Sequence, residues 1–159
     1  MNLLVSLLKP FIPWATQWVK DQEKRIIRLG TSLTDKQQED ARRAGVKHPD
    51  RIHIMVVPTI EPPNHPLLVL ASTFIDIIGP HTAGLTLRYG IYIREDCSHY
   101  NENRNLFVHE FVHTGQYERL GSIAAFLKEY LVECIAPGYP LGRQEQEAIL
   151  RAAEIVPVR

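Results

Sequence analysis

Apolar residues in the last third of the chain recur at the three- and four-residue spacing of buried helix faces. This spacing predicts a helix over Asn105–Leu120, which ends at Gly121, a residue suited to the left-handed conformation of helix ends. A second helix is expected over Ile123–Ile135, before a Pro-Gly pair that breaks it, and a third over about Arg143–Ile155. Residues 104–155 are therefore expected to form a helical part of the protein.

The middle of the chain carries the short β-branched runs that are typical of strands. Arg51–Thr59 is predicted to be a core strand, and Gly84–Arg94 alternates apolar and polar residues like a strand or ribbon. Gly90, inside the second run, indicates a bulge or a bend. Leu67–Ile78 is ambiguous: its spacing slightly favours a helix, although its last residues also fit a strand. Strands are thus expected within residues 50–95.

The first 45 residues are predicted to be a helical segment. Two prolines separate an apolar N-terminal stretch from a helix over Trp14–Leu29. Thr34 and Gln37 match a capping box, which opens a mostly polar surface helix that continues to about Ala44. The apolar stretch is expected to be a short amphipathic helix packed on the domain, with a weak membrane-surface anchor as the alternative.

Together these elements predict an α+β fold in a single domain that spans residues 1–159. The length supports one hydrophobic core but hardly two. A short mixed β-sheet or ribbon is expected to pack on the helix at Asn105–Leu120, with further helices before and after it in the chain.

Composition and charge exclude several classes of function. Of 159 residues, 45% are hydrophobic and 23% are charged, as in ordinary globular proteins. The 18 basic and 18 acidic residues cancel, which argues against a nucleic-acid binder held by bulk charge. No apolar run is long enough for an integral membrane span and no convincing signal peptide is present, so a cytoplasmic location is expected. The composition gives no indication of the oligomeric state.

The motif with the clearest chemistry is His109-Glu110-Phe111-Val112-His113. Residues four apart on a helix lie one turn apart on the same face, so both imidazoles can reach one cation. Zinc peptidases use this H-E-x-x-H arrangement, with two histidines as zinc ligands and the glutamate as general base. The motif therefore predicts a Zn²⁺ site at His109 and His113, with Glu110 as the catalytic base.

A catalytic zinc needs a third protein ligand, and the last predicted helix supplies two candidates. Glu145 and Glu147 are two residues apart, so on a helix their side chains point about 200° apart and only one can face the metal. If the small residues Ala148 and Ala152 face the histidine helix, Glu145 shares that side. Glu145 is therefore the preferred ligand, with Glu147 as the alternative.

Three side chains other than the glutamates compete for the remaining positions: His81, His99 and Cys97. For each of them a solvated or hydrogen-bonded side chain without a metal is the favoured interpretation. His81 lies in a polar loop before the predicted ribbon and is the one expected near the cleft. Cys134 falls on the apolar face of a predicted helix and is expected to be a buried thiol.

These residues resemble the zincin metallopeptidases, and among them the gluzincins, whose third ligand is a glutamate on a later helix. The match consists of the H-E-x-x-H pentad and a downstream E-x-x-A arrangement that begins at Glu145. The chain is also similar to small uncharacterised bacterial proteins in which H-E-x-x-H-x-x-Q-Y precedes a Tyr-containing turn and E-x-E-A. Here those residues are Gln116, Tyr117 and Tyr139. The resemblance covers roughly residues 84–153.

The resemblance implies a small zincin-like domain whose Zn²⁺ ligands are His109, His113 and Glu145. It also implies that Glu110 polarises the water and that the β ribbon offers its edge to an extended peptide. Many gluzincins carry an acidic residue that orients a ligand histidine. The corresponding position here is not acidic, which leaves Gln116 or Glu147 for that role.

The expected activity is hydrolysis of peptide bonds in a peptide or protein substrate. Glu110 would take the proton of the attacking water, and Tyr139 and His81 are candidates for the oxyanion donor, with Tyr92 as a further one. The alternative is a catalytically inactive zincin-like module that binds a metal and a partner. A fourth protein ligand such as Cys97 or His81 would favour the module, and an open fourth position would favour the enzyme.

Overall fold

The computed structural model describes residues 3–66 and 78–157. Helices combined with a small four-stranded mixed sheet confirm the predicted α+β class. The ambiguous segment Leu67–Ile78 falls, except for Ile78, outside the described residues. The described α-helices and strands are α1 (Leu3–Leu8), α2 (Ile12–Leu29), β1 (Thr31–Ser32), α3 (Asp35–Arg43), β2 (His53–Val57), β3 (Gly84–Leu87), β4 (Gly90–Arg94), α5 (Arg104–Leu120), α6 (Ile123–Glu133) and α7 (Arg143–Ile155).

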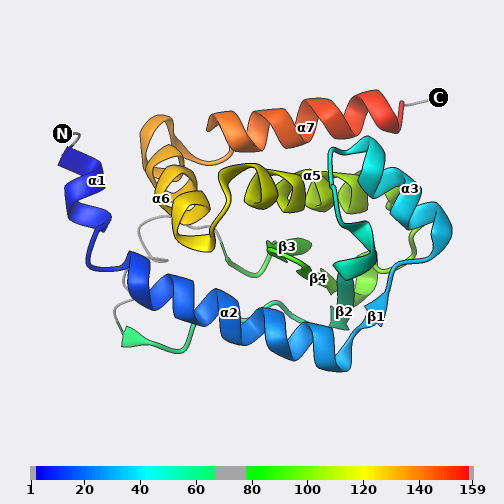
Figure 1. Ribbon diagram of the computed structural model, residues 1–159, viewed down its shortest axis with the longest axis horizontal. Coiled ribbons are helices and arrows are strands. Elements are labelled where there is room, and N and C mark those ends of the chain that lie inside the picture. Colours follow the sequence, from blue (N-terminus) through cyan, green and yellow to red (C-terminus); the bar gives the residue numbers. More distant parts are fainter. Residues whose placement is uncertain (1–2, 67–77, 158–159) are drawn as a thin grey trace.

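The sheet lies between two helical layers, as Figure 1 shows. Its strand order is β1-β2-β4-β3, in which β2 and β4 are parallel and the two outer strands are antiparallel to their neighbours. Helix α2 packs against one face of the sheet and α5 against the other, with α7 outside α5. Strand β3 is therefore an edge strand that lies directly beside the helix that carries the histidine motif.

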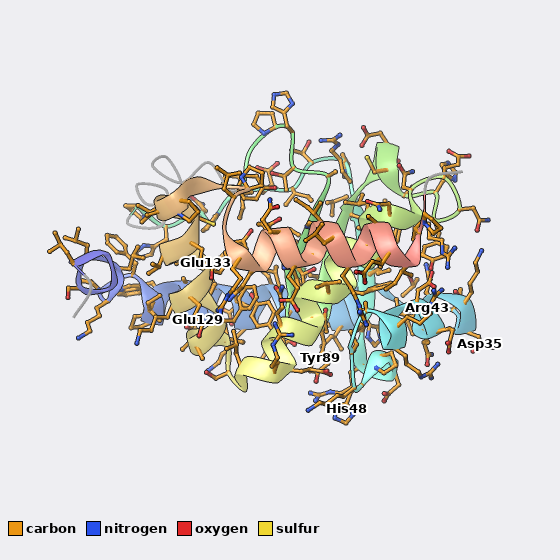
Figure 2. The ribbon with its side chains drawn as sticks, turned by 90° about the horizontal axis from the view of Figure 1, so that it is seen from above. Asp35, Arg43, His48, Tyr89, Glu129 and Glu133 are labelled. Atoms are coloured by element: carbon orange, nitrogen blue, oxygen red, sulfur yellow. The ribbon has the colours of Figure 1, made fainter. Side chains whose placement is uncertain are left out.

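Helix α5 is buried along most of its length because the sheet, α3 and α7 surround it. Viewed from above, α7 runs across the molecule over the other elements (Figure 2). Ala148 and Ala152 of α7 are fully buried in the same apolar cluster as Val108 and Phe111 of α5. These small side chains let the two helices approach closely, on the face of α7 that the sequence predicts.

Local sequence signals set several of the helix ends. Thr34 Oγ1 accepts from the backbone N–H of Gln37 at 3.3 Å, and Gln37 Oε1 accepts from the N–H of Thr34 at 2.8 Å, which completes the predicted capping box of α3. Helix α5 ends at Gly121, whose φ of 82° lies in the left-handed region that glycine adopts without strain. The three C-terminal helices begin and end within two residues of their predicted limits.

The bend of the predicted ribbon lies at Arg88 and Tyr89, which corrects the expectation that it lies at Gly90. Arg88 adopts a φ of 62°. The buried carboxylate of Glu23 on α2 accepts from the Arg88 guanidinium at 2.6 and 2.8 Å and from the Tyr89 N–H at 3.1 Å. Gly90 instead opens β4 where α2 passes so closely that an added Cβ would lie 2.9 Å from Ile26 Cδ1.

The N-terminal segment packs as a short helix against α6, as its amphipathic pattern predicts. Leu8 of α1 is buried, whereas Leu3 and Leu7 are exposed. Among the helices in the described part of the chain, none is both long enough and apolar enough to cross a bilayer.

Candidate metal centre

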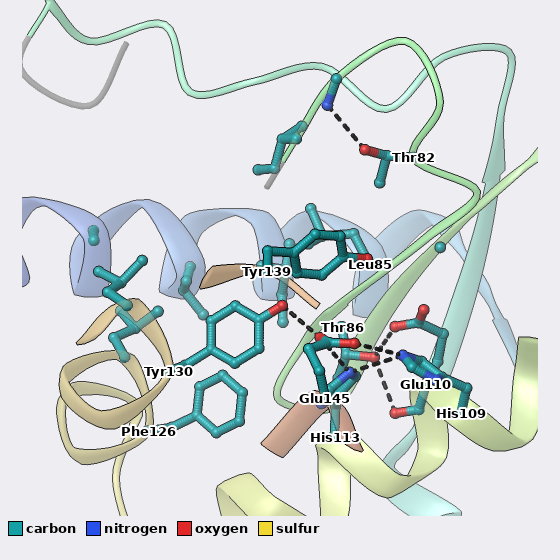
Figure 3. Close-up of a pocket in the computed structure, with 18 of the residues that line it drawn as sticks. Thr82, Leu85, Thr86, His109, Glu110, His113, Phe126, Tyr130, Tyr139 and Glu145 are labelled. Atoms are coloured by element: carbon teal, nitrogen blue, oxygen red, sulfur yellow. Dashed lines mark hydrogen bonds and ion pairs between the residues drawn. The ribbon is translucent and has the colours of Figure 1, made fainter. Parts of the chain in front are cut away.

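Helix α5 carries both motif histidines into the interior, where they meet a carboxylate from α7 (Figure 3). His109 Nε2 and His113 Nε2 lie 3.1 Å apart. Glu145 faces both, with Oε2 3.3 Å from His109 Nε2 and Oε1 3.1 Å from His113 Nε2. Within residues 3–66 and 78–157, no other set of three His, Cys, Asp or Glu side chains converges in this way.

This donor set fits a zinc ion. In a tetrahedral site with metal–ligand bonds of about 2.0–2.1 Å, neighbouring ligand atoms lie roughly 3.3 Å apart. The two imidazole nitrogens lie 3.1 Å apart, close to that value, and each lies 3.1 or 3.3 Å from a different oxygen of Glu145. Two imidazole nitrogens whose lone pairs face each other at this distance repel unless a proton or a metal ion lies between them. A proton or a metal ion between the three groups would relieve this repulsion, so these side chains could hold a metal ion.

The pKa values of Glu145 and His113 are shifted by their contacts within the cluster. Burial alone would raise the pKa of Glu145, but the hydrogen bonds from His109 and His113 hold it well below its usual value. Burial alone would lower the pKa of His113, yet the bond to Glu145 and the charge of Glu110 raise it. Both shifts favour charged forms of His113 and Glu145 that face each other in the metal-free cluster.

Gln116 fixes the orientation of His113. This glutamine is fully buried, and its Nε2 donates to the Gln144 carbonyl and to Glu147 Oε2, both at 2.9 Å. Because those two neighbours can only accept, the amide nitrogen must face them, and Gln116 Oε1 is left to accept from His113 Nδ1 at 2.8 Å. His113 therefore carries a proton on Nδ1, and its Nε2, which donates to Glu145 when the ring is protonated, can present a lone pair to a metal ion when the ring is neutral.

Glu147 points away from the histidines. Its carboxylate accepts from the Arg119 guanidinium at 2.7 and 3.1 Å and from Gln116. Of the two glutamates that the sequence leaves as alternatives, the structure thus brings Glu145 to the cluster and keeps Glu147 behind Gln116. The two residues that the sequence offers for orienting a ligand histidine lie in one hydrogen-bonded series, with Gln116 in direct contact with the ring.

Helix α6 holds Glu145 from the other side. The hydroxyl of Tyr130 donates to Glu145 Oε1 at 2.6 Å. Glu133, labelled in Figure 2, accepts from the backbone N–H of Gln144 at 2.8 Å, which satisfies an otherwise unpaired donor at the start of α7. Glu145 is therefore fixed both through its own carboxylate and through the helix end that carries it.

The motif glutamate, Glu110, is held by the edge strand β3. Glu110 is buried, and its Oε2 accepts from Thr86 Oγ1 at 2.7 Å. A Cβ added at Gly84 would lie only 2.6 Å from Glu110 Oε1, so the backbone of β3 passes against the carboxylate as closely as a glycine allows. Strand β3 thus holds the Glu110 side chain in place next to His109. Glu110 is not a member of the three-residue cluster.

A cavity of about 660 Å³ opens onto the cluster, and His109, Glu110 and Glu145 lie in its wall. Tyr139 and His81 line the same cavity, as the sequence prediction requires of an oxyanion donor. Tyr139 is half-exposed, and burial together with the charges of Glu145 and Glu110 raises its pKa to about 12. The structure therefore brings both candidates to the cavity, but neither forms a hydrogen bond with the cluster in the described part of the chain.

The remaining candidates lie elsewhere. Cys97 Sγ lies 3.9 Å from an Arg94 guanidinium nitrogen, and neither Cys97 nor the exposed His99 lines the cavity. The expectation that Tyr92 reaches the cleft is wrong, because its hydroxyl donates to Gln22 on α2 at 2.7 Å. Cys134 is buried, as predicted, and burial raises the pKa of its thiol to about 12.

Three residues around the site are not predicted from the sequence: Gly84, Thr86 and Tyr130. Tyr130 has the spacing of a core residue on α6, and nothing in that spacing indicates that its hydroxyl meets a carboxylate. Gly84 and Thr86 belong to an alternating strand pattern, and their role depends on which strand forms the edge beside α5.

No protein-family model matches the chain, and comparisons with curated proteins and with solved structures likewise give no match. The chemistry of the site therefore rests on its residues and their geometry.

Proposed function

We propose that this protein is a zinc-dependent peptidase in which His109, His113 and Glu145 hold Zn²⁺ and Glu110 is the general base. One observation carries the proposal. The imidazole nitrogens of two histidines lie 3.1 Å apart, and each lies within 3.3 Å of an oxygen of Glu145, beside a carboxylate that is held separately; all four side chains line one cavity. When bound, zinc polarises the scissile carbonyl and lowers the pKa of a water molecule.

The composition of the cluster supports a catalytic centre over a closed structural one. A structural zinc is enclosed by four protein ligands, whereas a catalytic zinc has three and leaves a position for water and substrate. In the described part of the chain the cluster has three members, and Cys97 and His81 are not among them. The cavity opens onto the cluster, so a substrate could reach a bound ion from that side.

In the proposed reaction, Glu110 moves a proton between water and the leaving amine. The Thr86 hydroxyl occupies one carboxylate oxygen, Oε2, and so restricts rotation of the side chain. A general base that is held in one orientation loses little entropy at the moment of reaction. Tyr139 and His81, across the cavity, are the candidates to donate a hydrogen bond to the oxyanion.

Strand β3 is the proposed binding edge for the peptide backbone. In the described sheet β3 pairs with β4 on one side, and residues 83–87 line the cavity on the other. An extended peptide can add to such an edge through main-chain hydrogen bonds. The scissile bond would then pass between Glu110 and the metal centre.

Metal analysis combined with cleavage assays tests the proposal. The purified protein is expected to contain about one zinc per chain. Glu110→Gln should retain the zinc and lose cleavage of a peptide library, whereas His113→Gln should lose both. Glu154→Gln, an exposed change on the same helix as Glu145, is the control and should alter neither.

Two results would count against the proposal in different ways. A correctly folded protein that takes up no zinc would refute the metal centre itself. A zinc-loaded protein that cleaves no member of a broad peptide library would favour the alternative, a catalytically inactive zincin-like module. Its partner would then be a peptide or protein that is bound and released unchanged.

A further inference from the structure

The cavity beside the metal centre has two chemically different ends. At one end lie the three residues of the cluster, Glu110 and Thr86, which Figure 3 shows close together. The other end lies between α2 and α6, which pack against each other. We call this end the α2–α6 compartment, and its walls include Phe11, Ala15, Trp18, Phe126, Leu127 and Leu131.

The α2–α6 compartment offers nothing to a charged group. Among the described residues that line the whole cavity there is no lysine or arginine, and the two carboxylates are those of Glu110 and Glu145. Both carboxylates already have partners: Thr86 donates to Glu110, and Tyr130 donates to Glu145. A charged substrate side chain would therefore lose its hydration there without gaining a counter-charge.

The cavity is also larger than the metal centre and the scissile peptide bond require. A cavity of about 660 Å³ falls in the range of pockets that enclose a whole small molecule. The metal centre and the scissile bond occupy its polar end, so the apolar end remains for another part of the substrate. That part must be uncharged and large enough to contact both α2 and α6.

We propose that the α2–α6 compartment is a specificity pocket for a bulky aliphatic or aromatic side chain of the substrate, next to the bond that is cleaved. The inference rests on the proposed peptidase function and adds the substrate class to it. It also makes the N-terminal helices part of the binding site, since they supply Phe11, Ala15 and Trp18. Each methylene group removed from such a side chain is expected to lower kcat/KM by roughly 10- to 200-fold.

Peptide binding tests the pocket without requiring turnover. Fluorescein-labelled alanine hexapeptides, with Leu, Phe, Asp or Lys placed at each position in turn, are titrated with Glu110→Gln protein in the presence of zinc. At one position Leu and Phe should bind at least tenfold more tightly than Asp and Lys. Adding Ala15→Phe, which fills the compartment from α2, should remove most of that preference.

Two further variants keep the test decisive. Leu131→Phe narrows the same compartment from α6, in case Ala15→Phe disturbs the packing of α2. Ala153→Phe, at an exposed position of α7 outside the cavity, is the matched control and should leave the preference unchanged. Equal binding of apolar and charged peptides at every position, or a preference that neither cavity variant reduces, would overturn the pocket.

The same peptides separate this inference from the proposed function. If wild-type protein cleaves them and favours Leu or Phe at the position found by binding, both proposals are supported. Cleavage without any such preference would overturn the pocket and leave the peptidase. Selective binding without cleavage would overturn the peptidase and leave the pocket as the recognition site of a binding module.

Discussion

Replacing Gln116 by Met tests whether the zinc site depends on an oriented histidine. Methionine keeps the length and helix preference of glutamine, but its thioether is only a weak acceptor. The variant loses the 2.8 Å contact with His113 Nδ1 and both donations of the amide, to the Gln144 carbonyl and to Glu147. His113 then keeps its place on α5 without a partner that selects its tautomer.

The size of the effect follows from burial. Gln116 is fully buried and His113 is 6% exposed, so water cannot replace the lost acceptor. A buried donor without a partner costs about 1–3 kcal/mol, and about 1.4 kcal/mol corresponds to a tenfold change in an equilibrium constant. The zinc Kd of Gln116→Met should therefore rise about 10- to 100-fold, the range seen when the partners of metal-bound histidines are removed.

Competition with a chelator of known affinity measures the zinc Kd, and long-range ¹H–¹⁵N NMR reports which nitrogen of His113 carries the proton. Glu147→Gln should have a smaller effect than Gln116→Met, because the Gln144 carbonyl still holds the Gln116 amide. Gln17→Met, an exposed change on α2, should leave the affinity unchanged. A folded Gln116→Met protein whose zinc affinity lies within about twofold of wild type, with the tautomer unaltered, would refute the orienting role.

Three further predictions concern catalysis, stability and metal removal. Thr86→Val removes the hydroxyl that donates to Glu110 and should lower kcat/KM about tenfold at unchanged zinc content; an unchanged kcat/KM would contradict the positioning role. Asp40→Asn should lower the free energy of urea unfolding by about 3 kcal/mol, because Arg104 donates two hydrogen bonds to this buried carboxylate. A loss below about 1 kcal/mol would contradict a stabilising role of this ion pair. Burial raises the pKa of Asp40, but Arg104 more than offsets it, so the stabilisation is present above about pH 3.8 and is lost only at lower pH. Zinc at about 100 times its Kd should stabilise the fold by about 2.7 kcal/mol, or roughly 5–10 °C in Tm by calorimetry against an EDTA-treated sample. In the metal-free protein the pKa of His113 is raised, so the stability that protonated His113 contributes is fully present below pH 6.5 and is lost as the pH rises through the raised pKa. The zinc-induced rise in Tm should therefore be larger at pH 8 than at pH 6.

Features that depend on neighbouring residues could be predicted from the sequence. The capping box at Thr34 and Gln37 and the stop at Gly121 are properties of a few consecutive residues, and the structure shows both. The inward face of α7 also follows from local periodicity, because Ala148 and Ala152 are small and one turn apart. The orientation of Glu145 then follows from the helix period alone.

Features that depend on contacts between distant segments could not be predicted. The turn at Arg88 is held by Glu23, which lies 65 residues earlier in the chain, so Gly90 was the more visible signal for a bend. The hydrogen bond from Tyr130 to Glu145 likewise depends on distant segments, because it forms only where α6 and α7 come into contact. Likewise, only the observed strand order makes β3 the edge that holds Glu110.

The two glutamates of α7 illustrate how one helical period can supply both a proposed metal ligand and the residue that supports the neighbouring histidine. Side chains two residues apart diverge by about 200°, so Glu145 and Glu147 cannot both face the histidines. Glu145 meets His113 directly, whereas Glu147 meets Gln116, which lies one turn further along α5. The same pair of helices is thus joined by two adjacent polar contacts, one inside the metal cluster and one behind it. Fully buried Ala148 allows the close approach of α5 and α7 that both contacts require. A larger side chain at this position should therefore weaken both the Glu145–His113 contact and the Glu147–Gln116 hydrogen bond.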